Sequence, residues 1–590
     1  MTTASGSASI TGSSLPKWQL ALAVGAPVAL GLGYMYYKNS LKPVPRRRGG
    51  SKGGAGKENG TSKDVELSVD SDILPTTLSA CESENEFKKV CSAQTPLEKA
   101  TQYKNEGNNY FKSGKYDEAI LSYNKAIETC PQENTMDLAT FYQNRAAAYD
   151  QLRKYSAVKA DCTKALELNP RYVKALQRRA RALEHSNDLV SVLEDVTAAC
   201  ILEQFSNQST LVMADRILKQ LGRQHAKEHM ANRKSVMPSK HFIKTYFSAF
   251  SKDPILSKLD EFKIAEPTTG YAKAKQTIRE EKYDNVISYC TEEIEHPDFV
   301  PEACMEVYLL RATFYLLLGY HEDASADLAK IINSKSTSKE LKVNALIKRA
   351  SMYMQLEDPE KCFLDFERAI EIDPKCGDIY HHRGQVNLLL EKINDAQDDF
   401  KKAVDLNPDF DIAFVQKCYT DYRHAVVSKD MNKVADVMTE FKRAFQKFPD
   451  CAECYTLYAQ ILCDTQDYAK ADSYFAKAIE RDPNNANIHV HRGLLHLQWN
   501  GNINKAIEYI NKALILDDKC EFGYETLGTI EVQRGNLKEA IELFDKALAL
   551  GRTEMELTHI FSLKDAAKTQ LTVTERLGLS SLLEIPTPGN

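Results

Sequence analysis

The chain has 590 residues, of which 27% are charged and 43% are hydrophobic, and its formal net charge is −6 at pH 7. This length exceeds what one compact core supports, so two or more lobes or an extended repeat array are expected. The acidic balance argues against a nucleic-acid partner. The 14 scattered cysteines argue against a secreted disulfide framework and favour reduced thiols in contact with the cytosol.

An uncharged segment from Trp18 to Tyr37 follows a short N-terminal tail over residues 1–17. Twenty residues at helical rise span ~30 Å, the hydrocarbon thickness of a bilayer. A basic cluster around Arg46 lies after the apolar run, which is the arrangement that keeps the following chain in the cytosol. The sequence therefore predicts an uncleaved single-pass transmembrane anchor over 18–37, with a cleaved secretory signal as the alternative. By themselves these residues suit the mitochondrial outer membrane and the endoplasmic reticulum alike.

A small residue recurs at one position of a repeat from about residue 95 onward, in several cases at steps of 34 residues. The ten positions are Gly107, Ala146, Ala180, Ala312, Ala350, Gly384, Cys418, Ala459, Gly493 and Gly528. Small residues let two antiparallel helices cross closely, and the prolines that end many copies stop the second helix. This is the tetratricopeptide pattern. With a weaker copy near Tyr283, it predicts eleven helix pairs in an all-α superhelix with a concave groove.

The repeats divide the chain after the anchor into segments. A polar stretch rich in glycine, serine and lysine predicts a flexible tether over 38–94. Three repeats predict a first lobe over 95–206, and eight repeats predict a second lobe over 263–553. Residues 207–262 interrupt the array and predict a helical connector. Residues 554–590 predict a capping helix for the last repeat, followed by a tail.

We expect no metal, no cofactor and no catalytic residue. Cys451 and Cys454 form a Cys-x-x-Cys pair, but structural zinc needs four ligands, and this spacing alone is a weak signal of redox use. His225 and His229 lie four residues apart without a glutamate directly after the first histidine, which excludes a zinc-protease motif. No stretch outside the repeats is long enough for a catalytic domain, so the sequence predicts a binding protein and not an enzyme.

Five polar residues of the first lobe occupy the helix faces that line the predicted groove. Lys104 and Asn108 lie four residues apart on one helix face, Asn144 lies on the same face of the second repeat, and Lys174 and Arg178 repeat the spacing in the third. Lysine supplies a point charge, arginine a bidentate fork, and asparagine further donors. The set predicts a receptor for a pair of carboxylates. Solvated helix faces are the alternative.

These five positions resemble the two-carboxylate clamp of co-chaperone tetratricopeptide domains. The resemblance implies that the first lobe holds the C-terminal Glu-Glu-Val-Asp tails of the 70-kDa and 90-kDa heat-shock chaperones.

The inner positions of the second lobe form a less polar stripe with scattered carboxylates. Its residues are Leu309, Ile347, Met354, Val415, Tyr419, Tyr422, Glu453, Val490, Leu494, Leu497 and Glu525. Apolar surface beside carboxylates would suit an apolar and mildly basic segment of a partner protein. The alternative is that the stripe is core, covered by the next repeat or by the terminal helix.

Two segments of the second lobe, DIYHHRGQ at 378–385 and GTIEVQRGN at 528–536, resemble the mitochondrial 70-kDa outer-membrane import receptor family. The resemblance implies a location in the mitochondrial outer membrane and contact with other translocase subunits. It also implies that docked chaperones deliver hydrophobic precursors, such as metabolite carriers, to the second lobe. A membrane-anchored co-chaperone or scaffold without direct precursor binding is the alternative.

Overall fold

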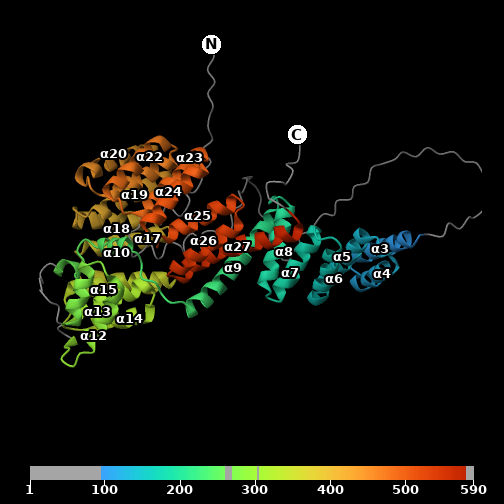
Figure 1. Ribbon diagram of the computed structural model, residues 1–590, viewed down its shortest axis with the longest axis horizontal. Helices are drawn as coiled ribbons and strands as arrows, with labels where there is room; N and C mark the ends of the chain where they lie inside the picture. The colour runs from blue at the N-terminus through green and yellow to red at the C-terminus, as the bar shows by residue number, and fades with distance from the viewer. Residues whose placement is uncertain (1–94, 260–268, 302–303, 580–590) are drawn as a thin grey trace, which may run out of the picture.

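The computed structural model describes residues 95–259, 269–301 and 304–579, and throughout these ranges the regular elements are helices (Figure 1). The predicted all-α array of antiparallel helix pairs is confirmed. The expected anchor over 18–37 and the tether over 38–94 lie outside the described residues. Among the helices that are described, none has the length and apolar character needed to cross a membrane.

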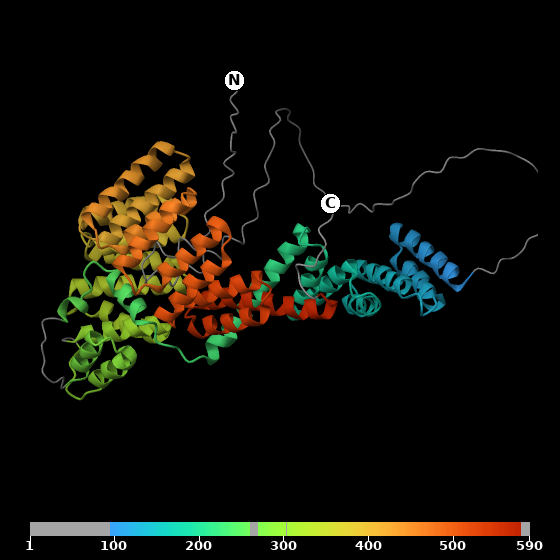
Figure 2. The ribbon, with the colours of Figure 1, turned by 45° about the horizontal axis from the view of Figure 1, so that its top comes forward.

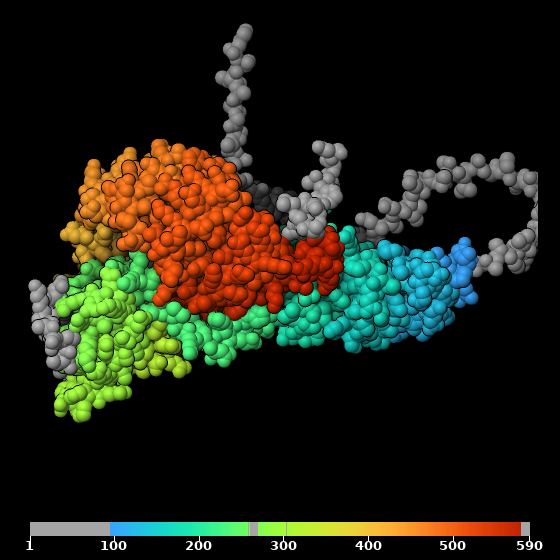
Figure 3. Space-filling view, viewed as in Figure 1, coloured from blue at the N-terminus to red at the C-terminus, as the bar shows by residue number. Residues whose placement is uncertain are grey.

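The first lobe consists of three helix pairs. Its helices are α3 (Pro96–Lys112), α4 (Tyr116–Thr129), α5 (Thr135–Gln151), α6 (Tyr155–Leu168), α7 (Val173–His185) and α8 (Leu189–Leu202). The first helices of successive pairs, α3, α5 and α7, adjoin one another, and so they make one continuous inner face. In the space-filling view this lobe projects as an arm from the larger second lobe (Figure 3).

The second lobe contains eight helix pairs in the described chain. Its helices are α11 (Gly270–Arg279), α12 (Val286–Ile294), α13 (Met305–Leu318), α14 (His321–Asn333), α15 (Lys339–Gln355), α16 (Pro359–Ile372), α17 (Gly377–Leu389), α18 (Ile393–Leu406), α19 (Asp411–Ser428), α20 (Met431–Lys447), α21 (Ala452–Asp464), α22 (Tyr468–Arg481), α23 (Ala486–Asn500), α24 (Ile503–Leu516), α25 (Glu521–Gln533) and α26 (Leu537–Leu550). A short 3₁₀ turn, Tyr283–Asn285, precedes α12.

The recurring small residues lie where the two helices of a pair cross. A Cβ atom added at Gly107 would lie 2.6 Å from the ring of Tyr123 on the partner helix, and one added at Gly528 would lie 2.8 Å from the ring of Phe544. Both rings are buried. The 34-residue pattern therefore reflects close packing within each pair, where one large ring fills the space left by one missing side chain.

The turn inside every described pair contains a residue with positive φ. These residues are Gly114, Arg153, Asn187, Glu281, Gly319, Glu357, Glu391, Lys429, Gln466, Gly501 and Gly535. A left-handed residue ends the first helix and lets the second helix run back against it. Seven of the eleven are not glycine, so packing between the two helices determines this turn even where the residue does not favour it.

A buried ion pair recurs between the two helices of five described pairs. Each joins an arginine directly before the small residue to an aspartate sixteen residues later, at 2.6–2.7 Å: Arg145–Asp161, Arg179–Asp195, Arg311–Asp327, Arg349–Asp365 and Arg383–Asp399. The aspartates are buried. Bidentate contact of this kind fixes the register of one helix against the other.

Helices α9 (Gln208–Asn232) and α27 (Glu554–Leu577) run side by side between the lobes (Figures 1 and 2). Helix α27 packs against α26 and then continues past the second lobe to reach α8. Its end packs into the first lobe, where Val573 and Leu577 share a core cluster with Leu176, and Arg171 Nη2 donates to the Leu577 carbonyl oxygen at 3.1 Å. Helix α27 thus belongs to both lobes.

The end of the connector lies inside the second lobe. This inner segment, residues 239–256, contains α10 (Lys240–Ser248) and packs against the first helices of several pairs. Its side chains Ile243, Tyr246, Phe247, Phe250 and Ile255 are buried.

A buried ion pair also holds the inner segment. Lys348 Nζ on α15 lies 3.2 Å from Asp253 Oδ2, with side-chain exposures of 0% and 1%. The same ammonium lies over the rings of Phe247 and Phe250 at 5.5 and 5.0 Å. The segment is therefore part of the core of the second lobe.

Candidate functional site

The five predicted clamp residues lie on the three adjoining first helices of the first lobe. Lys104 and Asn108 are on α3, Asn144 is on α5, and Lys174 and Arg178 are on α7. The two asparagines meet, because Asn144 Nδ2 donates to Asn108 Oδ1 at 3.4 Å. The structure therefore joins residues from two repeats that are 36 positions apart in the sequence.

The orientation of Asn108 is set by a residue that the sequence analysis did not single out. The hydroxyl of Tyr123 donates to Asn108 Oδ1 at 2.8 Å, and burial raises the pKa of this hydroxyl to about 12. Two donors therefore hold the carbonyl oxygen of Asn108. Its amide nitrogen is left as the end that can donate to a ligand.

The guanidinium of Arg178 is partly buried against α5. Its Nη1 donates to the carbonyl oxygen of Gln143 at 3.4 Å, and its Nε lies 3.7 Å from Asp150 Oδ2. Burial lowers the pKa of Arg178, and Nε is a buried donor without a hydrogen-bond partner in the structure. A carboxylate ligand would satisfy this donor and offset the desolvation of the charge.

The two lysines of the set behave differently from Arg178. Lys174 is exposed and Lys104 is partly exposed, and neither has a carboxylate partner among the described residues. Two unpaired ammonium groups beside a desolvated guanidinium make this face of the lobe attractive to anions. The arrangement can hold a peptide that ends in more than one carboxylate.

The apolar stripe predicted for the second lobe is mostly core. Seven of its nine apolar residues are at most 3% exposed: Leu309, Ile347, Met354, Val415, Tyr419, Tyr422 and Val490. Only Leu494 and Leu497 are partly exposed, as are the acidic residues Glu453 and Glu525. Burial of the seven favours the core alternative that the sequence left open, and it removes them from the surface that a ligand could contact in this structure.

The inner segment covers much of this stripe, together with the neighbouring repeats and, through Met555, the terminal helix. Phe250 belongs to the same buried cluster as Ile347 and Tyr419, and Phe247 belongs to the cluster that contains Leu309. The sequence contained a signal for this role, because large apolar residues recur through 242–255 of the connector. Ile243, Tyr246, Phe247 and Phe250 follow helical spacing, which indicates an amphipathic helix but does not reveal what its apolar face packs against.

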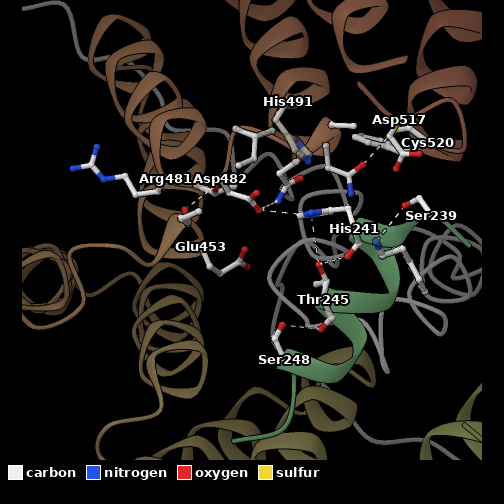
Figure 4. A pocket seen from close by; sticks show the side chains of 18 of the residues that line it. Ser239, His241, Thr245, Ser248, Glu453, Arg481, Asp482, His491, Asp517 and Cys520 are labelled. Atoms are coloured by element: carbon white, nitrogen blue, oxygen red, sulfur yellow. Dashed lines mark hydrogen bonds and ion pairs between the residues drawn. The ribbon is translucent and has the colours of Figure 1, made fainter. Parts of the chain in front are cut away.

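Beside the inner segment a cavity of about 540 Å³ remains between α10 and the first turns of α19, α21, α23 and α25. Figure 4 shows Glu453 extending into it from α21, opposite His241 and Thr245 of α10. His241 Nε2 lies 3.7 Å from Asp482 Oδ2 and closes one side. Of the eleven residues predicted for the second lobe, Glu453 alone lines this cavity.

The cavity has an acidic lining. Its carboxylates are Asp411, Asp450, Glu453, Asp482, Asp517 and Glu521, and its cations are Arg481, Lys519 and Arg552. Burial, with a contribution from Asp411, raises the pKa of Glu453 to about 8, and burial also raises the pKa of Glu521. A basic group entering the cavity would favour the ionised forms of both acids.

A buried amide forms part of the same wall. Gln416 is 1% exposed, and its Oε1 accepts a hydrogen bond from Gln385 Nε2 at 3.0 Å. Its own Nε2 has no hydrogen-bond partner in the structure. Because this nitrogen is itself buried, a carbonyl oxygen of a bound peptide would satisfy it only after the Gln416 side chain turns toward the cavity. The cavity therefore combines acidic groups for a cation with an amide donor for a peptide backbone.

Within the described ranges, no cluster of three or more histidine, cysteine or carboxylate residues could hold a metal ion. His225 lies 2.9 Å from Asp565 on α27, and His229 packs against Phe561 of the same helix. Both histidines thus contribute to the packing of α9 on α27.

Comparisons with known proteins agree with the helix-pair architecture. The tetratricopeptide repeat family is matched at residues 100–133, and a second description of the same repeat matches 139–172, 343–376, 377–410 and 452–485. The mitochondrial import receptor subunit TOM70 of Rattus norvegicus is 46% identical over 580 residues, which cover 96% of this chain and 93% of the relative.

Two solved structures are also similar. The crystal structure of yeast Tom70 is 25% identical, covers 82% of this chain and 99% of its own, and has a TM-score of 0.46. The second tetratricopeptide domain of human RPAP3, solved in complex with an HSP70 peptide, is 33% identical. It covers 21% of this chain and 97% of its own, with a TM-score of 0.19.

Proposed function

The chain belongs to the family of the mitochondrial import receptor subunit TOM70. From this premise we propose that its two lobes bind two different classes of partner protein. The first lobe docks the C-terminal tails of the 70-kDa and 90-kDa heat-shock chaperones. The second lobe receives hydrophobic precursor proteins, notably metabolite carriers, for transfer to other translocase subunits. The observation that carries the proposal is the set of clamp residues on α3, α5 and α7.

The clamp geometry supports a dicarboxylate ligand. A tail that ends in aspartate presents its terminal carboxylate and a side-chain carboxylate close together. Lys104 and Lys174 offer two unpaired ammonium groups, and Arg178 offers a desolvated guanidinium with one unsatisfied donor. The amide nitrogens of Asn108 and Asn144 add neutral donors on the same face. Charge and hydrogen bonding thus favour the same ligand end.

Calorimetry with a chaperone tail peptide tests this assignment. Removal of one charge-assisted hydrogen bond weakens binding by about 1.5–3 kcal/mol, so Arg178→Ala should weaken the peptide by about ten- to a hundredfold. Lys164→Ala is the control, because it removes the same charge from the outer helix α6, where the Lys164 side chain is 59% exposed. Equal affinity of the wild type and Arg178→Ala would overturn the clamp.

For the second site we propose the acidic cavity beside the inner segment. It is large enough for several side chains, and its carboxylates suit a segment that is apolar with occasional basic residues. The seven buried residues of the apolar stripe are not part of this proposal. Glu453 remains from the predicted set, and Gln416 joins it as a buried side-chain amide donor for a peptide backbone.

Site-specific photo-crosslinking to newly made carrier precursors tests the second site. A crosslinker at Asn487, which lines the cavity, should capture precursor, whereas one at Lys512 on the outer helix α24 should not. Capture must persist when chaperones are removed from the translation mixture. Crosslinks confined to the first lobe, or lost without chaperones, would favour a membrane-anchored co-chaperone or scaffold that does not bind precursor.

We also propose that residues 18–37 anchor the chain in the mitochondrial outer membrane, with the lobes facing the cytosol. Residues 1–60 fused to a fluorescent protein should label mitochondria, and protease added to intact organelles should remove the fluorescent domain. Labelling of the endoplasmic reticulum would contradict the location. A protease-resistant fluorescent domain would contradict the orientation.

A further inference from the structure

Four helices of the second lobe begin with a cysteine at the N-cap position. They are α13, α17, α21 and α25, with Cys304, Cys376, Cys451 and Cys520 as their N-caps. The N3 residues of three of them are Val307, Ile379 and Gly523. On α21 the N3 residue is Cys454. One of the four helices therefore has a Cys-x-x-Cys pair across its first turn. The other three begin with the same N-cap cysteine but have no second cysteine at N3.

The position at the helix start brings the two side chains of this pair together. Inside a helix, Cβ atoms three residues apart lie about 5–6 Å from each other, which exceeds the ~3.5–4.5 Å that a disulfide allows. Cys451 lies outside the helical backbone, with φ −75° and ψ 99°, and the amide of Cys454 donates to the Cys451 carbonyl oxygen at 3.1 Å. A side chain at the N-cap is directed toward the N2 and N3 residues, although Cys451 itself makes no side-chain cap hydrogen bond.

The thiols already interact in the reduced protein. A hydrogen bond with the Cys451 side chain raises the pKa of the Cys454 thiol, and burial raises it further. A raised pKa keeps Cys454 protonated, so Cys451 is the thiol that can act first.

The two cysteines also differ in their exposure to solvent. Cys451 is partly exposed and lines the acidic cavity, whereas Cys454 is 0% exposed in the core of the lobe. A small molecule in the cavity can reach Cys451 but not Cys454. This combination of an accessible attacking thiol and an adjacent protected thiol is the arrangement that thiol–disulfide exchange requires.

We propose that Cys451 and Cys454 form a redox-active dithiol that closes to an intrahelical disulfide by exchange with a low-molecular-weight disulfide such as glutathione disulfide. The Cys451 thiolate attacks one glutathione sulfur, which forms a mixed disulfide and releases one glutathione thiolate. Cys454 then loses its proton and attacks the Cys451 sulfur, which releases the second glutathione. Two cysteine thiols are oxidised and one glutathione disulfide is reduced to two glutathione molecules. The two protons pass to the released thiolates.

The disulfide forms in the wall of the cavity. It would tie the N-cap of α21 to its first turn, on either side of Glu453, and turn the Cys451 sulfur away from the cavity. Oxidation would therefore alter the lining of the cavity without a change in the helix-pair array.

Mass mapping of the full-length chain in detergent tests the proposal. The protein is incubated at increasing ratios of oxidised to reduced glutathione, alkylated, and digested with trypsin and a glutamate-specific protease. Cleavage after Glu453 separates the two cysteines, so their fragments stay together only through a disulfide. The expected result is a linked pair of fragments in which both free thiols are lost together. The same linked pair should form in the Cys463→Ser variant.

Cys376 is the internal control, because it is a partly exposed N-cap cysteine with Ile379 at N3. Burial raises the pKa of its thiol to about 11, so it should carry at most mixed glutathione disulfide and no intrahelical link. In Cys454→Ser, Cys451 should accumulate the same mixed disulfide, whereas Cys376→Ser should leave the linked fragments unchanged. The proposal is overturned if wild-type Cys451 keeps glutathione as Cys376 does, if neither cysteine reacts, or if Cys451 is linked to Cys463.

Discussion

The inner faces of the two lobes are built from the same helix pair, yet one is open and the other is filled. On the first lobe the inner face presents ammonium groups at Lys104 and Lys174 that have no carboxylate partner among the described residues. On the second lobe the inner segment covers the face, and the ammonium of Lys348, at the repeat position that Arg178 holds in the first lobe, is buried against Asp253. The repeat therefore provides a concave surface, and whatever occupies that surface decides whether its residues bind a ligand or form core.

The two lobes also differ in the environment of their lysine side chains. A lysine on the open face remains hydrated until a ligand arrives, so it costs the fold little. The buried lysine needs its aspartate, because an unpaired charge in the core is strongly destabilising. Variants of these residues should therefore affect ligand binding in the first lobe and stability in the second.

The largest predicted effect is the loss of stability of the second lobe when the buried Lys348–Asp253 ion pair is broken. Lys348→Met leaves Asp253 buried without its partner and should lower the free energy of unfolding of the second lobe by about 3–5 kcal/mol. Chemical denaturation followed separately in each lobe would measure this. The double variant Lys348→Met with Asp253→Leu should recover much of the loss, because no charge then remains buried. A loss below about 1 kcal/mol in the single variant would mean that the inner segment is not fixed as described.

The second largest predicted difference between the two inner faces is their dependence on salt concentration. The clamp lysines are accessible to solvent, so chaperone-peptide affinity should fall about tenfold or more between low and high salt, because counterions screen exposed charges. Calorimetry at several ionic strengths measures the slope, and Lys174→Ala should reduce it. The unfolding midpoint of the second lobe should depend much less on salt. A salt-independent peptide affinity would contradict an open, charged inner face.

The acidic cavity predicts a pH dependence confined to the second lobe. Burial, together with Asp411, holds the folded-state pKa of Glu453 near 8, above its ordinary 4.5. The folded state then binds more protons than the unfolded state between these values, so this residue's contribution to stability is complete below pH 4.5 and is lost as pH rises through 8. Glu453→Gln should make the fall in unfolding free energy between pH 5 and 8 shallower. An unchanged slope would show that Glu453 is hydrated.

The smallest predicted effects are the stability changes caused by substitutions in the turns inside helix pairs, and they should be equal in the two lobes. Arg153 in the first lobe and Glu391 in the second both occupy the left-handed turn inside a pair. Replacement of either by glycine removes the steric cost of positive φ but adds entropy to the unfolded chain, so each change should stabilise by at most about 1 kcal/mol. Thermal unfolding measures both. Opposite signs in the two lobes would show that the turns are not locally equivalent.

Much of the architecture could be predicted because its cause is local and repeated. Gly107 and Gly528 face large rings of their partner helices, and such close crossings leave the 34-residue pattern in the sequence. The clamp positions could be named for the same reason, since a repeat position implies a helix face. The recurrent arginine–aspartate pairs were also visible, as arginine before the small residue, but their meaning required the partner sixteen residues away.

The missed features depend on contacts between distant segments. Nothing near Ile347 or Tyr419 in the sequence indicates that residues around Phe250 cover them. Likewise Gln416 becomes a candidate ligand donor only because Gln385 occupies its oxygen and the cavity opens beside its nitrogen.

The sequence by itself determined the helix pair, its number of copies, and the residues that each copy turns inward, because short-range packing within a pair imposes a fixed spacing. Only the tertiary structure decided which inward-facing residues remain accessible. That outcome depends on where the connector and the C-terminal helix come to lie. Their position follows from burial of apolar surface, which is non-directional, so the sequence shows that a helix face is buried but not which surface covers it.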